Sequence, residues 1–462
     1  MKSSLAQPVY QPQPGGQVKP PQWYRRVSLL TAMAMILGWL GPLYCMMGGS
    51  LETNYSPERI ETLFVYEANW PGRLLIALGA ACFIMAGLLS QARQRGFRLG
   101  QAARIGLWAL LACSLFWFLW IVNPADLKTS LNITYTPLMW FMVIGIFVAF
   151  GLPISQDVDM VVLSIAVLSA GHALWAYHAD TLIAMAGGSP LYTSFVTAFW
   201  TLAYCVAAPG ALLNRVRSFL WVPLLVLAYL AIVVGMRGWS IQIGFLAVML
   251  VAMSHRRQSL PYYVGGGLAA ICLVAWVMHV QPGLLDRFFE RLGADTRSHQ
   301  YQDLFLRVDW VGLFRGYGPL ATYDSGRTQG YNYIDNQVLY VLFKFGAVTL
   351  IGYVLVILLP AVRVLFLPVP WRVRALAVVP VLWLLAMVGV STFSAITMNT
   401  ANYVLILTAG HCHSILWRHQ STRGRGGRRL AWIQNAVRMG GRGSSGRKEG
   451  RVVPSRTAKP IC

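Results

Sequence analysis

Long apolar stretches, separated by short polar connections, recur along the whole chain. A helix needs about 20 predominantly apolar residues to cross the hydrocarbon core of a bilayer. On that basis the pattern predicts twelve membrane-spanning helices. They are expected near residues 27–47, 72–90, 105–122, 136–154, 159–176, 192–212, 219–235, 240–254, 261–280, 335–359, 375–392 and 400–416.

The composition agrees with that pattern. Of the 462 residues, 56% are hydrophobic and 12% are charged, whereas soluble domains carry about 25% charged residues. We therefore expect an all-α polytopic membrane protein. The seven cysteines contain no Cys-x-x-Cys pair, so neither a disulfide framework nor a zinc site is indicated.

Basic residues are distributed unevenly among the connections. With the N-terminus in the cytoplasm, most of the 38 basic residues fall on the cytoplasmic side, together with only Asp157, Asp159 and Glu449 of the 16 acidic ones. Cytoplasmic segments of membrane proteins carry such an excess of Lys and Arg. The net charge of +22 is therefore interpreted as an orientation signal, with both termini cytoplasmic, and not as a nucleic-acid-binding surface.

Three regions follow from this topology: a cytoplasmic segment over residues 1–26, a membrane domain over 27–416 and a basic tail over 417–462. The tail is rich in Arg and Gly and is expected to be disordered apart from a short surface helix that contains Leu430, Ile433 and Val437. Its expected partner is the anionic inner leaflet, which attracts basic segments next to a membrane span.

One outer connection, residues 281–334, is much longer than the others and is predicted to be a structured periplasmic loop between the ninth and tenth spans. The stretches "LLDRFFERLG" and "YQDLFLRVDWVGLF" have helical, amphipathic spacing. The following stretch "RGYGPLATYDSGRTQGYNY" is rich in Gly and Tyr and predicts a loop.

The tenth span opens with Asp335 and Asn336 and contains Lys344. Ionisable residues inside spans usually mark function. Asn336, Tyr340 and Lys344 are spaced four residues apart and share one helix face, which predicts a polar stripe lining a wet cleft that opens outside. The alternatives are that Asp335 caps the helix N-terminus and that Lys344 extends along its own stem to water. Arg237, at the start of the eighth span, is either an interface anchor or a site residue.

Two stretches resemble the bacterial O-antigen ligase and polysaccharide polymerase superfamily. "RVDWVGLFRGYGPL" resembles its Arg-x-x-Trp and Gly-x-Gly segment, and "DNQVLYVLFKFGAVTLIG" resembles the segment that follows it there. Arg237 with Gly238 is similar to the Arg-Gly pair of that superfamily. Two positions depart from the family pattern, because Asp335 stands in place of the usual His and Lys344 in place of the common Glu.

The resemblance implies an enzyme of the bacterial inner membrane that polymerises oligosaccharide repeat units carried on undecaprenyl diphosphate, at the periplasmic face. No metal or other cofactor is expected, because the sequence does not indicate the clustered outer carboxylates that a metal-dependent glycosyltransferase would need. Asp335, Arg307 and Arg237 are the candidate catalytic residues: the arginines would stabilise the diphosphate leaving group, and Asp335 would assist the attacking hydroxyl. The candidate substrate-binding residues are Asn336, Tyr340, Lys344, Trp310, Arg315, Tyr317 and Tyr331.

Two other functions are consistent with the pattern. An O-antigen ligase would use the same donor but transfer the glycan to lipid A core. A lipid-linked oligosaccharide flippase or another transporter would also have many spans, but the internal repeats typical of transporters are not visible in this sequence. The expected partners are the lipid-linked donor and acceptor, the bilayer, and a chain-length regulator or other export proteins.

Overall fold

The computed structural model describes most of the predicted helices. The described residues are 21–47, 70–93, 99–121, 154–179, 190–253, 304–306, 308–318, 323–325, 328–331, 336–389 and 400–440, with isolated positions between them. The chain divides into two compact units, Met1–Leu416 and Trp417–Cys462.

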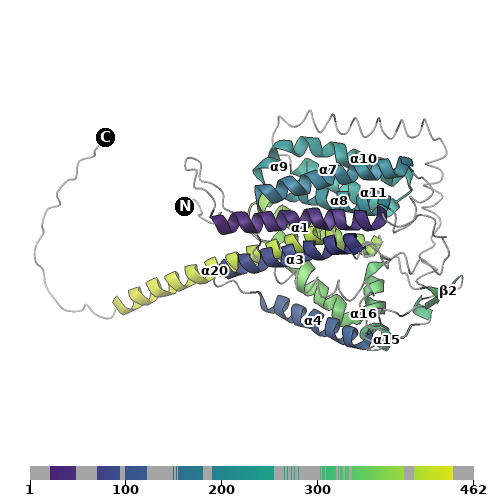
Figure 1. Cartoon of the computed structure of the whole chain (residues 1–462). Coiled ribbons are helices and arrows are strands. Elements are labelled where there is room, and N and C mark those ends of the chain that lie inside the picture. Colours follow the sequence, from purple (N-terminus) through teal and green to yellow (C-terminus); the bar gives the residue numbers. More distant parts are fainter. Residues whose placement is uncertain are drawn as a thin grey trace, which may run out of the picture. The chain divides into compact units, whose positions relative to one another are not determined.

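The first unit is built almost entirely of helices (Figure 1). In chain order its elements are α1 (Gln22–Met47), α3 (Trp70–Arg93), α4 (Gln101–Ile121), α7 (Gln156–Ala179), α8 (Pro190–Ala207), α9 (Ala211–Val216), η4 (Arg217–Leu220), α10 (Trp221–Val233), α11 (Arg237–Ala252), α15 (Trp310–Arg315), β1 (Tyr323–Ser325), β2 (Thr328–Tyr331), α16 (Gln337–Tyr353), η6 (Val354–Leu358), α17 (Leu359–Leu365), α18 (Trp371–Arg374), η7 (Ala375–Ala377), α19 (Val378–Gly389) and the start of α20 (Thr400–Gly440).

Five helical stretches in the described part of the chain are long and apolar enough to cross a membrane. They are Gln22–Tyr44, Leu74–Ala92, Gln156–Ala179, Leu212–Val233 and Val338–Leu365, and four shorter apolar helices accompany them. Together they coincide with most of the expected spans, while those near 136–154 and 261–280 lie largely outside the described residues. The helices fit a multi-pass membrane protein; the count of twelve and the orientation stay predictions.

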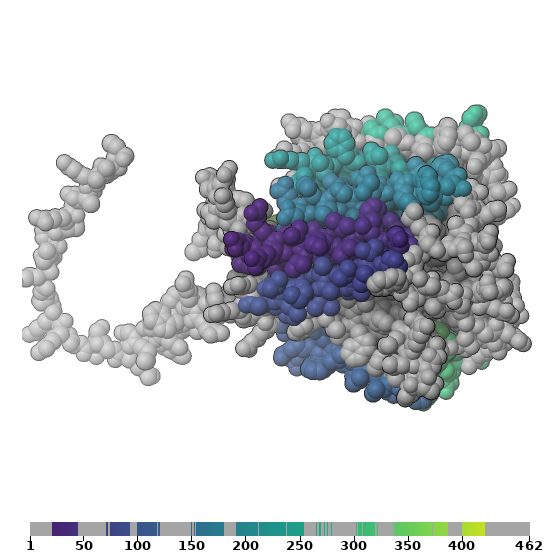
Figure 2. All heavy atoms as spheres, in the orientation of Figure 1, coloured from purple at the N-terminus to yellow at the C-terminus, as the bar shows by residue number. Residues whose placement is uncertain are grey.

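Small residues let α1 and α3 approach closely, and the two helices lie side by side in Figures 1 and 2. A Cβ atom added to Gly41 of α1 would lie 2.6 Å from the side chain of Ile76, and one added to Gly79 of α3 would lie 3.1 Å from Leu37. Helix pairs in membranes gain stability from such close van der Waals packing, because hydrocarbon solvent provides no hydrophobic driving force between them.

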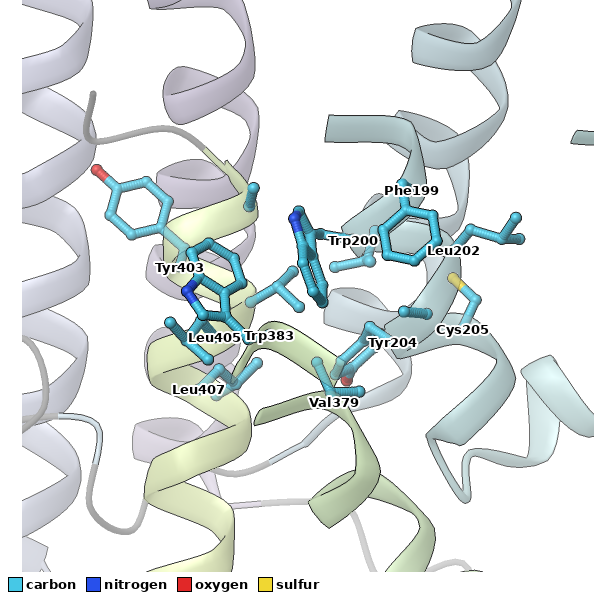
Figure 3. Packing of buried hydrophobic residues seen from close by; sticks show 14 of the residues in the cluster. Phe199, Trp200, Leu202, Tyr204, Cys205, Val379, Trp383, Tyr403, Leu405 and Leu407 are labelled. Atoms are coloured by element: carbon cyan, nitrogen blue, oxygen red, sulfur yellow. The ribbon is translucent and has the colours of Figure 1, made fainter. Parts of the chain in front are cut away.

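The largest core cluster joins α8, α19 and α20 around two tryptophans (Figure 3). The rings of Trp200 on α8 and Trp383 on α19 lie 4.5 Å apart between centroids. Tyr403 on α20 stacks on Phe83 of α3 at 5.0 Å. These aromatic contacts connect the C-terminal span to the first half of the chain, so residues far apart in sequence form one core.

A buried arginine joins two helix ends. Arg217 is 5% exposed, and its guanidinium donates to the carbonyl oxygen of Met253, just after α11, at 3.0 Å and to that of Ala208, just after α8, at 3.2 Å. The last carbonyls of a helix have no intrahelical donor, and a cation is favourable there. Arg217 therefore caps the C-terminal ends of α8 and α11 together.

The long connection that precedes α16 contains a hairpin that the sequence did not indicate. The stretch predicted to be a loop includes β1 and β2, which pair antiparallel with Tyr323 opposite Tyr331 and Ser325 opposite Thr328. The expected amphipathic helix is interrupted: Gln302 and residues 304–306 are helical, Asp309 is extended, and a new helix begins at Trp310. The stretch "LLDRFFERLG" lies outside the described residues.

The second unit contains the continuation of α20, which remains helical from Trp417 through Gly440. The helix includes the predicted surface-helix residues Leu430, Ile433 and Val437. Helical structure in the tail is therefore longer than expected, since disorder was predicted for most of it. Residues 441–462 lie outside the described part.

Candidate functional site

The short helix α15 begins at an aspartate N-cap, and a tyrosine that follows the helix hydrogen-bonds to that aspartate. Asp309 is its N-cap and accepts from the backbone N–H of Gly312 at 2.7 Å. The hydroxyl of Tyr317 donates to the same carboxylate at 2.6 Å. These hydrogen bonds lower the pKa of Asp309 below its ordinary value, and the bond from the Tyr317 hydroxyl contributes more than the bond from the Gly312 N–H. The carboxylate thus fixes the turn that follows α15 while staying ionised.

That turn docks onto a kink in α16. Gly346 has φ 83° and ψ 169°, which interrupts the helix. Helical carbonyls normally bond the N–H four residues later, so the kink leaves carbonyls free for other donors. The N–H of Tyr317 donates to the backbone carbonyl of Phe343 at 2.8 Å, and the N–H of Gly318 donates to the backbone carbonyl of Lys344 at 3.0 Å. The segment after α15 is therefore joined to α16 through backbone hydrogen bonds.

Two glycines allow this approach. Gly316 has φ 85°, and a Cβ atom there would lie 2.7 Å from the backbone of Gly346. A Cβ on Gly346 would lie 2.6 Å from the backbone of Phe314 and Arg315. A left-handed φ also disfavours any side chain. The Gly-x-Gly of the loop and the Gly of the span thus form one interlocked junction, which we call the α15–α16 junction (residues 309–318 and 343–346).

A tryptophan of α4 completes the junction. Its indole Nε1 donates to the carbonyl of Phe345 at 3.4 Å, and Trp117 belongs to a small core cluster with Leu304, Tyr340, Phe343 and Phe345. Figure 1 shows α4, α15 and α16 next to one another. Trp117 was not predicted as part of the site, because a tryptophan near the end of a span is usually an interface anchor.

Lys344 is buried in this cluster. It is 1% exposed, its Nζ donates to the backbone carbonyl of Ala321, and it lies 5.8 Å from the ring centroids of Tyr340 and Phe343. Tyr340 is 4% exposed. The prediction that these residues line a wet cleft is therefore wrong for these two side chains, and so is the alternative that Lys344 reaches water. Lys344 instead fixes the loop against α16 through a charge-assisted hydrogen bond.

The N-terminus of α16 is capped by Asn336. Its Oδ1 accepts from the N–H of Val338 at 3.0 Å and from that of Leu339 at 3.2 Å. The cap predicted as the alternative role of Asp335 is thus provided by its neighbour. Asp335 itself lies outside the described residues, and its proposed role as a base stays a prediction.

Only some of the remaining predicted site residues lie at the α15–α16 junction. Trp310 opens α15 and is 79% exposed, Arg315 closes α15 and is exposed, and Tyr317 is 38% exposed. These three belong to the α15–α16 junction, as does Lys344. Tyr340 lies one helical turn before Lys344 on α16, and Asn336 is the N-cap of that helix. Tyr331 lies on β2 and Arg237 is the first residue of α11, but both side chains, like the whole of Arg307, are outside the described part.

Other polar residues in the spans have structural partners. Asp159 accepts from the hydroxyl of Tyr204 at 2.9 Å, and Asp157 accepts from Ser28 at 3.0 Å. Nε2 of His413 hydrogen-bonds to the carbonyl of Val356 at 2.7 Å. Among the described residues no group of three or more His, Cys, Asp or Glu side chains is arranged to hold a metal ion.

No family model, curated protein or solved structure matches the chain significantly.

Proposed function

We propose that the protein is a membrane glycosyltransferase that polymerises undecaprenyl-diphosphate-linked oligosaccharide repeat units at the outer face of the bacterial inner membrane. The observation that carries the proposal is the α15–α16 junction. The two sequence stretches that resemble the polymerase and ligase superfamily are separated by fourteen residues, and they are in direct backbone contact in the described structure.

The geometry of the junction supports a site at the start of α16. Tyr317 and Gly318 hold the loop segment on α16, and Asn336 fixes where the helix begins. Asp335 directly precedes that cap, so it lies in sequence next to a rigid helix start. A reacting group gains most from being held rigidly in its productive geometry.

The chemistry of the reaction assigns a role to each candidate. Breaking the bond between the anomeric carbon and the diphosphate oxygen leaves negative charge on the lipid diphosphate. Arg237 and Arg307 would stabilise that charge, because a guanidinium binds phosphate oxygens in a planar fork. Asp335 would accept the proton of the attacking hydroxyl. Exposed Trp310 and Tyr317 offer flat faces for sugar rings.

The proposal is tested with the purified, full-length protein in proteoliposomes supplied with a lipid-linked repeat unit. We expect a ladder of longer glycans and the release of undecaprenyl diphosphate. Arg237→Ala and Arg307→Ala should each abolish the ladder, and Arg→Lys should fail as well, since one ammonium cannot replace the fork. Arg104→Ala, an exposed arginine near the start of α4, is the matched control and should keep it.

The products of this assay also distinguish a polymerase from the two alternative functions, a ligase and a transporter. Transfer of the glycan to added lipid A core, without chain growth, would contradict the polymerase and favour the ligase. Movement of the lipid-linked glycan across the bilayer, without any release of undecaprenyl diphosphate, would contradict both transferases and favour a transporter.

A further inference from the structure

An apolar groove lies between three elements of the first unit. It has a volume of about 350 Å³ and is lined by Ala112, Cys113, Phe116 and Trp117 of α4, Phe314 and Arg315 of α15, and Phe345 and Val348 of α16. Trp117 and Phe345 are buried and form its floor, whereas Phe116, Phe314 and Val348 are exposed along its walls. The groove is therefore open to whatever surrounds α4 and α16.

Arg315 is the one charged residue in this lining. Asp309, the N-cap of α15, interacts electrostatically with Arg315, and its carboxylate already accepts hydrogen bonds from the Tyr317 hydroxyl and the Gly312 N–H. Arg315 therefore has a fork of donors at the edge of an apolar groove, which is the arrangement that suits an amphiphile with an anionic head and a hydrocarbon chain.

We propose that this groove binds one acyl chain of an anionic phospholipid, with the lipid phosphate on Arg315. The groove volume is at the small end of ligand sites, which measure about 300–1,000 Å³, so it takes part of a single chain. One guanidinium balances the single negative charge of a phosphodiester, whereas a polyprenyl diphosphate carries more charge than the lining can neutralise. The lipid would bridge α4 and α15 beside the α15–α16 junction. In this proposal Arg315 binds a lipid phosphate, whereas the sequence analysis predicted that it binds the glycan.

Binding is measured by native mass spectrometry of the full-length, delipidated protein titrated with phosphatidylglycerol or phosphatidylcholine. We expect phosphatidylglycerol to be retained at roughly tenfold lower concentration, because the choline cation of phosphatidylcholine offsets the phosphate charge that Arg315 would neutralise. Arg315→Ala should remove that preference, and Arg104→Ala should keep it. Ala112→Trp, which fills the groove from an exposed position, should reduce retention of both lipids.

The reactivity of two native cysteines tests whether the lipid binds in the groove. Cys113 lines the groove and is half-buried, while Cys272 is exposed and lies outside it. Phosphatidylglycerol should slow maleimide labelling of the Cys113 peptide and leave the Cys272 peptide unchanged.

Three results would overturn the proposal. The first is an unchanged preference for phosphatidylglycerol in Arg315→Ala, and the second is equal protection of Cys113 and Cys272. The third is protection of Cys113 by a polyprenyl diphosphate, or by inorganic phosphate alone, at tenfold lower concentration than by phosphatidylglycerol. The folded state of each variant is checked by its unchanged thermal unfolding temperature.

Discussion

Gly346→Ala should open the α15–α16 junction without disturbing the rest of the bundle. The new Cβ would lie 2.6 Å from backbone atoms of Phe314 and Arg315, and neither backbone can rotate away as a side chain would. Ala at the φ and ψ of Gly346, 83° and 169°, costs about 1–3 kcal/mol, because that region is essentially restricted to Gly. Loss of the two hydrogen bonds from Tyr317 and Gly318 adds about 0.5–1.5 kcal/mol each. The junction should therefore be about 2–6 kcal/mol easier to open.

Amide hydrogen exchange reports this directly, because the N–H groups of Tyr317 and Gly318 are bonded to carbonyls of α16. Local opening made easier by about 2–6 kcal/mol speeds exchange by about 30-fold or more. The matched control is Gly171→Ala in α7, where an added Cβ meets nothing within 4 Å and should be neutral or slightly stabilising. Unchanged exchange over 316–318 in Gly346→Ala would refute the reasoning.

Three further changes separate structural from functional roles. Arg217→Ala should lower the free energy of unfolding by about 3–6 kcal/mol, since two buried carbonyls lose charge-assisted bonds at about 1.5–3 kcal/mol each. Exposed Arg215→Ala should change it by less than about 0.5 kcal/mol, and equal thermal shifts of the two variants would contradict the cap. Asn336→Asp should preserve the cap and polymerisation, whereas Asn336→Ala should cost about 1 kcal/mol; loss of activity in a stable Asp variant would instead indicate glycan binding. Tyr317→Phe should raise the lowered pKa of Asp309 toward 3.8. The ionised Asp309 stabilises the wild-type protein above the ordinary pKa of Asp, and this stabilisation is lost as pH falls through the lowered native pKa. The difference in thermal unfolding temperature between the wild-type protein and Tyr317→Phe should therefore shrink at low pH. A difference that does not depend on pH would contradict this role of Tyr317.

The sequence predicted the helices well where apolar length alone determines them. The span expected near 159–176 corresponds to α7, and that expected near 335–359 begins at Gln337 and continues through η6. The hairpin was missed because its strands have only three and four residues, Tyr323–Ser325 and Thr328–Tyr331. So few residues show no alternation that distinguishes a strand from a Gly-rich loop.

The site was harder to predict because its contacts depend on backbone geometry. Asp335 and Asn336 are equally good capping residues, so propensity could not show that Asn336 takes the cap. The burial of Lys344 depends on the kink at Gly346 and on Ala321, twenty-three residues earlier in the chain. Helical spacing correctly placed Tyr340 and Lys344 on one face, but it could not show that the loop covers that face.

Asp335→Asn is the most direct test of the claim that glycosyl transfer takes place at the start of α16. Because Asn336 provides the cap, the substitution should leave helix stability unchanged and affect only the chemistry. The rate of undecaprenyl diphosphate release from a lipid-linked repeat unit is compared between the purified wild-type protein and this variant, at equal amounts of folded protein. A general base contributes about 10²–10⁴-fold, so the account predicts at least a 10²-fold slower release, with Asp335→His partly active. Release at the wild-type rate in Asp335→Asn would contradict it.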